Sequence, residues 1–122
     1  MILVDTSVWV GHFRHGEAPL SRLLEEGLVL THPLVIEELS CGALADRGAI
    51  LRLLHALPWA PGASHPELLS LIEAERLGGS GLGAVDAHLL ASARLSRARL
   101  WTFDGALARA ARRLGVLAVP PS

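Results

Sequence analysis

The sequence predicts an α/β fold: a three-layer α/β/α sandwich around a mainly parallel sheet of four to five strands. Two observations lead to this prediction. Short apolar runs, typical of strands buried on both faces, alternate along the chain with longer segments whose apolar residues recur at helical spacing. The chain also has 122 residues, of which 51% are hydrophobic, and this is enough for a single domain over residues 1–122 with a core on each face of the sheet.

The first predicted elements are a strand and two helices. The apolar run ILV leads into Asp5, which predicts a strand over residues 2–5, and apolar residues at helical spacing predict a helix over residues 6–14. A second helix begins at Pro19, a residue favoured in the first turn of helices, and ends before Gly27, a residue that stops them.

The middle of the chain is predicted to be mostly helical. After a short strand over residues 28–31, helices are expected over residues 33–44, 49–57 and 66–77. Residues 58–62 include two prolines and are expected to form a loop or a short edge strand.

The C-terminal third continues the alternation of strands and helices. The glycine-rich residues 78–83 predict a loop, and the nearly apolar residues 84–96 predict a helix that should be largely buried. A strand over residues 99–103, a helix over residues 104–114 and a last strand over residues 116–119 follow.

Composition excludes several classes of protein. Cys41 is the only cysteine, which excludes an internal disulfide and a cluster of thiolate metal ligands. No apolar run is long enough to span a membrane and no signal peptide is recognisable, so we expect a soluble cytoplasmic protein with no membrane partner. The chain has no lysine, which excludes a P-loop and disfavours the phosphotransfer chemistry of response-regulator receivers and haloacid-dehalogenase-type enzymes.

The charges divide unevenly along the chain although the net charge is only −1. Residues 1–85 carry five arginines against ten acids, whereas residues 86–122 carry six arginines against two acids. A basic C-terminal third can attract a polyanion. The alternative is a helix surface on which the arginines are merely solvated, and composition alone favours this alternative.

Two carboxylates are expected at one edge of the sheet. Asp5 ends the first predicted strand, and Asp104 directly follows the strand over residues 99–103. Because ligands of such α/β proteins bind at the carboxyl ends of the strands, the two acids are expected to meet at the binding edge.

Two further acids lie in predicted helices that are otherwise apolar. Asp86 is near the start of the helix over residues 84–96. Glu38 lies inside LVIEELSCG, where Gly42 is expected one turn away on the same face and would leave space beside the carboxylate. The alternative for Glu38 is a solvated pair with Glu37.

Three of these acids also have a purely structural explanation. Asp5 or Thr6 can cap the first helix, and Asp104 can cap the last one. Asp86 suits the first turn of its helix, where the helix dipole favours an acid. Taken together these explanations weaken, because each of four apolar neighbourhoods contains such an acid.

The joint presence of these acids predicts a divalent metal site. Neighbouring carboxylates repel one another unless a cation joins them. Oxygen ligands without a cysteine select Mg²⁺ or Mn²⁺, ions that acidify a bound water and stabilise charge on phosphoryl oxygens. We therefore interpret Asp5 as a carboxylate compensated by such an ion, with the hydroxyl of Thr6 offered to the ion or to its waters.

His32 and Trp59 are two further residues of interest. His32 ends the second predicted strand and can line the edge. Trp59, between two prolines, is expected to be partly exposed, whereas Trp9 and Trp101 are expected to lie in the core.

Four ordered motifs resemble the PIN domain, and most closely the ribonuclease toxins of the VapC type in toxin–antitoxin pairs. They are VDTSVW at the start, VIEELSCG in the E-L-x-x-G form, GLGAVDAHLLASA in the middle and LWTFD near the end. Their order and spacing match the family and they cover most of the chain, so the expected sandwich is PIN-like.

The resemblance implies a Mg²⁺- or Mn²⁺-dependent endoribonuclease with four catalytic acids: Asp5, Glu38, Asp86 and Asp104. Asp5 and Asp86 would be the principal metal ligands, and Asp104 would contribute directly or through water. Glu38 would orient the attacking water or support the ligands from behind them. Only the E-L-x-x-G match selects Glu38 rather than its neighbour Glu37.

The resemblance also implies supporting hydroxyls and partners. Thr6 and Thr102 match the small hydroxyl positions beside the acids of the family. Family members act on RNA and are usually homodimers neutralised by a cognate antitoxin, whose tail often places an arginine against the acids. The apolar residues 49–59 are a candidate face for such partners. The alternative function is a non-catalytic PIN-like module that binds RNA or protein, with structural acids.

Overall fold

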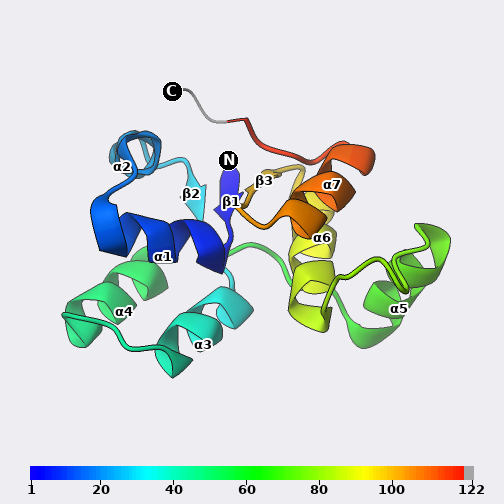
Figure 1. The fold of residues 1–122 in the computed structure, drawn as a ribbon, viewed down its shortest axis with the longest axis horizontal. Coiled ribbons are helices and arrows are strands. Elements are labelled where there is room, and N and C mark those ends of the chain that lie inside the picture. The colour runs from blue at the N-terminus through cyan, green and yellow to red at the C-terminus, as the bar shows by residue number, and fades with distance from the viewer. Residues whose placement is uncertain (120–122) are drawn as a thin grey trace.

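Three parallel strands form the sheet at the centre of the molecule (Figure 1). The structure is a computed structural model and describes residues 1–119. The central strand, β1 (Ile2–Val4), pairs with β2 (Val29–Leu30) on one side and with β3 (Arg99–Trp101) on the other. The all-parallel order β2-β1-β3 confirms the predicted α/β class.

The prediction of four to five strands is wrong, because only three form within residues 1–119. The segment 58–62 contributes a single bridge at Trp59, where the Thr31 N–H donates to the Pro58 carbonyl and the Thr31 carbonyl accepts from the Ala60 N–H. Prolines on both sides of Trp59 supply no N–H group, so the ladder next to β2 cannot continue.

The predicted last strand is likewise reduced to one bridge, between Leu100 and Leu117. Leu100 N–H donates to the Val116 carbonyl, and Ala118 N–H donates to the Leu100 carbonyl. Beyond Trp101 the backbone of β3 leaves the sheet, so little strand remains for this segment to pair with. The two bridges thus extend the sheet by one residue at each edge.

Seven helices lie around the sheet within the described residues. They are α1 (Thr6–His15), α2 (Ala18–Glu25), α3 (Pro33–Cys41), α4 (Arg47–Ala56), α5 (His65–Ala74), α6 (Ala84–Ser96) and α7 (Gly105–Arg113). In Figure 1 the first four helices lie on one side of the strands and the last three on the other. No helix in this part of the chain has both the length and the apolar character needed to cross a bilayer.

Two helices end before their predicted limits. α3 stops at Cys41 rather than at residue 44, because Gly42 adopts an extended conformation with φ −89° and ψ 173°. α5 stops at Ala74 rather than at residue 77, because Arg76 adopts a left-handed conformation with φ 54°. In each case a local change in backbone conformation, not a loss of apolar periodicity, ends the helix.

The core lies on both faces of the short sheet. β1 and β3 contribute Leu3, Val4 and Leu100, each completely buried, and Trp9 of α1 packs with them. The predictions that Trp9 and Trp101 are core residues are confirmed. α6 buries six residues, which confirms the predicted burial of that helix. Leu89, Leu90 and Ala93 pack in this core. Ala87 and Ala91 pack with Leu68 of α5 in a second cluster.

The topology places the carboxyl end of β1 at a reversal of strand order. From β1 the chain proceeds to β2 on one side, and it later crosses to β3 on the other side. Connections that leave a central strand in opposite directions open a crevice at its carboxyl end. Asp5, the first residue after β1, therefore lies at the point where this fold binds ligands.

Candidate active site

Asp5 is the most buried acid of the site. Only 6% of its surface is exposed, and its Oδ2 accepts hydrogen bonds from Ser7 Oγ and Thr102 Oγ1, each at 2.7 Å. Oδ1 has no hydrogen-bond partner among residues 1–119. Although Asp5 occupies the N-cap position of α1, its side chain makes no capping bond. The capping explanation is therefore wrong, and one carboxylate oxygen remains available to a ligand.

The two hydroxyls that hold Asp5 also hold the segment that follows β3. Ser7 Oγ accepts a hydrogen bond from Phe103 N–H, and Thr102 Oγ1 accepts one from Asp104 N–H, both at 3.0 Å. The two hydroxyl oxygens lie 3.3 Å apart. Each hydroxyl accepts a hydrogen bond from a backbone N–H and donates one to Oδ2 of Asp5. Successive hydrogen bonds in such a chain strengthen one another.

Ser7 is a residue that the sequence prediction misses. The resemblance selects Thr6 and Thr102 as supporting hydroxyls, and the structure joins Thr102 to Asp5 but joins Thr6 to a different acid. The available signal was the position of Ser7 two residues after Asp5 at the start of a helix, where a side chain can fold back onto the preceding residue.

Asp86 lies half-buried in the first turn of α6. Its Oδ2 accepts a hydrogen bond of 3.1 Å from Gly83 N–H, so the helix-start explanation is correct for this one oxygen. Burial raises the pKa of Asp86, the Gly83 bond opposes this shift, and the charges of Asp5 and Asp104 raise the pKa further. Asp86 is therefore near enough to Asp5 and Asp104 to be affected by their charges.

Asp104 is the exposed member of this group. It occupies the N-cap position of α7 but its side chain makes no capping bond, so the capping explanation fails here too. Its backbone is fixed by the N–H bond to Thr102. The carboxylate therefore stands at the edge of the sheet with its position set by the backbone.

Glu38 is tied to the site through Thr6. Thr6 Oγ1 donates a hydrogen bond of 2.7 Å to Glu38 Oε1, which links the first residue of α1 to the middle of α3. This contact distinguishes Glu38 from Glu37, which the sequence alone leaves open. Gly42 ends α3, and a Cβ placed there would touch only the Leu39 carbonyl, at 3.5 Å, so the structure gives this glycine no role in making room for Glu38.

His32 has a structural position beside the site. It is 3% exposed, its Nδ1 accepts a hydrogen bond from Leu34 N–H at the start of α3, and its Nε2 lies 3.0 Å from Ser92 Oγ of α6. Burial lowers the pKa of His32, and the charge of His88 lowers it further. The neutral ring therefore caps α3 and ties it to α6 rather than lining an open edge.

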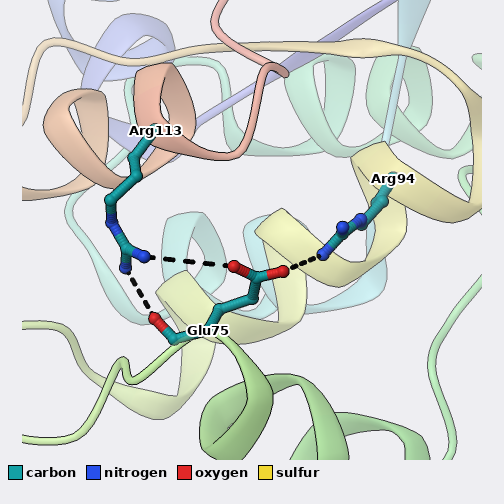
Figure 2. Close-up of polar contacts among 3 residues, drawn as sticks. All are labelled: Glu75, Arg94 and Arg113. Atoms are coloured by element: carbon teal, nitrogen blue, oxygen red, sulfur yellow. Dashed lines mark hydrogen bonds and ion pairs between the residues drawn. The ribbon is translucent and has the colours of Figure 1, made fainter.

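A second acidic residue, Glu75, shows how the chain neutralises a carboxylate elsewhere. Figure 2 shows Glu75 Oε1 2.9 Å from Arg94 Nη1 and Oε2 3.9 Å from Arg113 Nη1. Arg113 Nη2 also donates to the Glu75 carbonyl at 2.8 Å. Two arginines of the basic C-terminal third are thus engaged in joining α5 to α6 and α7.

The candidate site has no such arginine. Within residues 1–119 the ion pairs of arginine with acid are the two on Glu75, and none involves Asp5, Glu38, Asp86 or Asp104. Carboxylates that are buried or mutually repelling need a positive charge to remain ionised together. The described part of the chain does not supply that charge at this site.

The donor chemistry fits a hard divalent ion. Among residues 1–119, no three or more side chains of His, Cys, Asp and Glu form a group that could hold a metal ion as they stand. Mg²⁺, however, keeps several waters and binds proteins through one or two carboxylates together with substrate phosphates. The oxygen of Asp5 that lacks a partner and the nearby carboxylates of Asp86 and Asp104 meet that smaller requirement.

A well-formed pocket lies away from these acids. It has a volume of about 520 Å³ between α5 and α6, and its mainly apolar lining includes Leu71, Ala91 and Leu95, with Arg94 at its side. None of the four predicted catalytic acids lines it. An apolar groove of this kind does not provide the charges that a phosphodiester requires, so the chemistry is expected at the acidic edge.

Comparisons with known proteins place the chain among relatives of one kind. The PIN domain model matches residues 2–113. Two proteins named Ribonuclease VapC32, from Mycobacterium tuberculosis strains CDC 1551 / Oshkosh and ATCC 25618 / H37Rv, are 50% identical over 117 residues, which cover 95% of this chain and 94% of theirs. The crystal structure of PAE2754 from Pyrobaculum aerophilum has a TM-score of 0.59 at 20% identity, over 89% of this chain and 78% of that one, and supports the fold alone.

Proposed function

The chain belongs to the PIN domain family, among its VapC-type members, and from this premise we propose that it is a Mg²⁺- or Mn²⁺-dependent endoribonuclease. Its proposed role is the toxin of a toxin–antitoxin pair in the cytoplasm. Relatives that are half identical over nearly the whole chain and carry the name ribonuclease support an RNA-cleaving activity.

One observation carries the metal dependence in this proposal. Asp86 has a pKa raised by burial and by the charges of Asp5 and Asp104, yet no described arginine forms an ion pair with any of these three residues. Residues 1–119 contain all eleven arginines, yet two of them pair with Glu75 and none pairs with this group. A divalent cation compensates such a group.

In the proposed mechanism Asp5 and Asp86 would hold the ion, and Asp104 would contribute directly or through water. When bound, the ion stabilises negative charge on phosphoryl oxygens and makes a water more acidic. Ser7 and Thr102 occupy Oδ2 of Asp5 and so reserve Oδ1 for the ion.

Glu38 has the remaining role in the proposed mechanism. Because Thr6 occupies Oε1 of Glu38, Oε2 is the oxygen that orients the attacking water. Hydrolysis joins the water oxygen to phosphorus, breaks one P–O ester bond and transfers a proton to the leaving oxygen.

The proposed partners are an RNA substrate, a cognate antitoxin and a second copy of this chain. Leu53 and Trp59 are exposed in the apolar segment 49–59, and Leu95 is exposed beside the groove between α5 and α6. Exposed apolar side chains of this kind support protein contacts. Sedimentation of the purified chain tests the homodimer, and a monomer would contradict it.

The direct test of the proposed function is an RNA cleavage assay with Mg²⁺ or Mn²⁺ on the wild-type chain and on Asp5→Ala. We expect cleavage by the wild type that is abolished by a chelator and by the substitution. Glu75→Gln is the matched control, since it also removes a carboxylate but lies outside the site. Equal cleavage by the wild type and Asp5→Ala would contradict the proposal.

A second candidate function is a non-catalytic PIN-like module that binds RNA or protein. The observation in its favour is that no three acids among residues 1–119 form a ready metal-holding group. It predicts no stabilisation by Mn²⁺ in a thermal melt, whereas the nuclease proposal predicts a clear increase in the melting temperature.

A further inference from the structure

Phe103 is an exposed aromatic residue within the acidic site. It follows Thr102, which holds Asp5, and precedes Asp104, and 52% of its surface is accessible to solvent. Its exposure is close to that of Leu95, at 50%, so its position between Thr102 and Asp104, not its exposure alone, distinguishes it. The sequence prediction does not single it out, because LWTFD looks like a strand that ends in an acid.

The ring of Phe103 is held in a defined position despite its exposure. Its backbone N–H donates to Ser7 Oγ, the same hydroxyl that binds Asp5. Its edge lies against Gly11 of α1, where a Cβ would be only 3.3 Å from Phe103 Cε2. Trp101 packs edge-to-face against it, with ring centroids 5.9 Å apart and an interplanar angle of 87°.

A positive charge lies at the first turn of α7, the helix that Asp104 precedes. The Arg109 Nη1 atom lies 3.2 Å from the position that a Cβ on Gly105 would occupy, so the guanidinium covers the first turn of α7. Among residues 1–119, Arg109 has no carboxylate within ion-pair distance. An arginine in this position is available to a phosphate.

We propose that Phe103 stacks on an unpaired base of single-stranded RNA, while Arg109 binds a neighbouring phosphate. The inference rests on the proposed function only in taking RNA as the ligand. Unpaired bases are recognised by stacking on aromatic side chains and phosphates by arginine. Asp104 lies between the two contacts along the chain, so a nucleotide held by both reaches the acidic edge.

The surroundings of Phe103 favour a base over a protein surface. The exposed apolar residues Leu69 and Leu95 belong to α5 and α6, and Leu53 belongs to α4. Phe103 stands apart from them, directly between Thr102 and Asp104 along the chain. A single ring flanked by an acid and an arginine matches one nucleotide, with its flat base and its anionic phosphate.

Trp59 is the matched comparison for Phe103. It is 47% exposed, but it lies beside β2, and its Nε1 donates to the His55 carbonyl of α4. Trp59 follows α4 and is bridged to Thr31, whereas Phe103 directly follows Thr102, which holds Asp5, so the proposal assigns the stacked base to Phe103 and not to Trp59.

The test measures the binding of a short single-stranded RNA of mixed sequence whose riboses all carry 2′-O-methyl groups, so that no cleavage occurs. We expect Phe103→Ala and Phe103→Leu to raise the Kd about tenfold and Phe103→Trp to retain the wild-type Kd. Trp59→Ala should leave the Kd within about twofold of the wild type. Arg109→Met should raise the Kd and reduce its dependence on salt.

A double-mutant cycle, which combines probes that lack one base with Phe103→Leu, identifies the contact. Removing one base from the probe should weaken binding to the wild type about tenfold at one position and should have little further effect in Phe103→Leu, because both changes remove the same stacking. Phe103→Leu keeps an apolar side chain against Gly11, and its melting temperature verifies that it is folded.

The outcomes separate this inference from the proposed function. Phe103-dependent binding without cleavage of unmodified RNA by the wild type would leave the inference standing and would refute the nuclease. Cleavage by the wild type with unchanged Kd in the Phe103 variants would refute the inference alone. No measurable binding of the probe, or a change in sedimentation of Phe103→Ala with unchanged RNA binding, would also refute it.

Discussion

Glu75 and Asp5 are both acids removed in part or entirely from solvent, and the chain treats them differently. Glu75, at the end of α5, meets Arg94 of α6 and Arg113 of α7 (Figure 2). Asp5, at the end of β1, meets only the hydroxyls of Ser7 and Thr102. One carboxylate receives positive charge from the protein, and the other receives neutral hydrogen-bond donors.

The two environments have different physical consequences for the Glu75 cluster and for the acidic edge of the sheet. An acid that is paired with arginines can hold helices together, and it needs no cation from the solution to compensate its charge. An acid held by neutral donors beside further acids remains a source of negative potential, which attracts a cation. The contrast implies that changes at Glu75 affect stability and changes at the acidic edge affect activity.

The largest expected effect is the loss of activity in Asp5→Asn. Asparagine keeps the shape and can still accept from Ser7 or Thr102, but it removes the charge that we assign to metal binding. We expect RNA cleavage to fall by at least about a hundredfold, with a melting temperature in metal-free buffer that does not fall by more than a few degrees. Glu75→Gln should cleave RNA at close to the wild-type rate. Activity that falls equally in the two variants would erase the distinction between the regions.

The next effect is stabilisation by Mn²⁺. An ion that binds only the folded protein adds about 2.7 kcal/mol of stability at a concentration about 100 times its Kd. We expect this gain in the wild type and in Glu75→Gln but not in Asp86→Asn, measured as a shift in the melting temperature. The asparagine side chain of that variant can still accept a hydrogen bond from Gly83 N–H, so the start of α6 should remain intact. A full Mn²⁺ shift in Asp86→Asn would show that the ion binds elsewhere.

A smaller effect is expected for the stability of Glu75→Gln. This change removes the charge that the two arginines meet, although both arginine side chains are half-exposed and the pairs are screened by water. We expect a loss of about 1 kcal/mol in the free energy of unfolding, or about 4 °C in the melting temperature. High salt should reduce the difference from the wild type. A variant as stable as the wild type at low salt would contradict a structural role for the cluster.

The smallest effect concerns His32, which contacts the helix that joins the two regions. α6 carries Asp86 at its start, Ser92 in its middle and Arg94 near its end, and Ser92 contacts His32. The pKa of His32 is lowered from 6.5 in the folded protein, chiefly by burial, so the unfolded chain binds a proton at a higher pH than the folded chain does. Stability from the neutral ring is therefore complete above pH 6.5 and declines as the pH falls below it.

His32→Asn tests this pH dependence. Asparagine can still accept a hydrogen bond at the start of α3 but does not titrate. We expect the free energy of unfolding of the wild type to fall more steeply than that of the variant between about pH 7 and about pH 5. Parallel curves for the two proteins would contradict the assignment of a neutral, capping His32.

The sequence predicted the elements well where local patterns govern them. β1, α1 and α6 appear where apolar periodicity predicts them, because the spacing of apolar residues determines which face of an element is buried. The same reasoning overestimated the number of strands. An apolar run becomes a strand only if a neighbour offers a continuous ladder, and the short β3 and the prolines around Trp59 do not offer one.

For the candidate site, the sequence by itself determined which acids follow the strands and which lie in buried helices. That prediction follows from the polarity of parallel strands, which brings all their carboxyl ends to one edge. It selected Glu38 over Glu37 only through the E-L-x-x-G match, and it gave no role to Ser7 or Phe103. Whether these residues perform the proposed chemistry is decided by the experiments above.

Only the tertiary structure decided which side chains meet. Thr6 contacts Glu38 across 32 residues of sequence, Thr102 contacts Asp5 across 97, and Glu75 meets Arg94 across 19. Contacts of this kind depend on how helices pack against the sheet, and no local spacing encodes them. The sequence thus determined where acids stand along each element, and packing determined which of them pair with arginines and which are, in the proposed function, available to a cation.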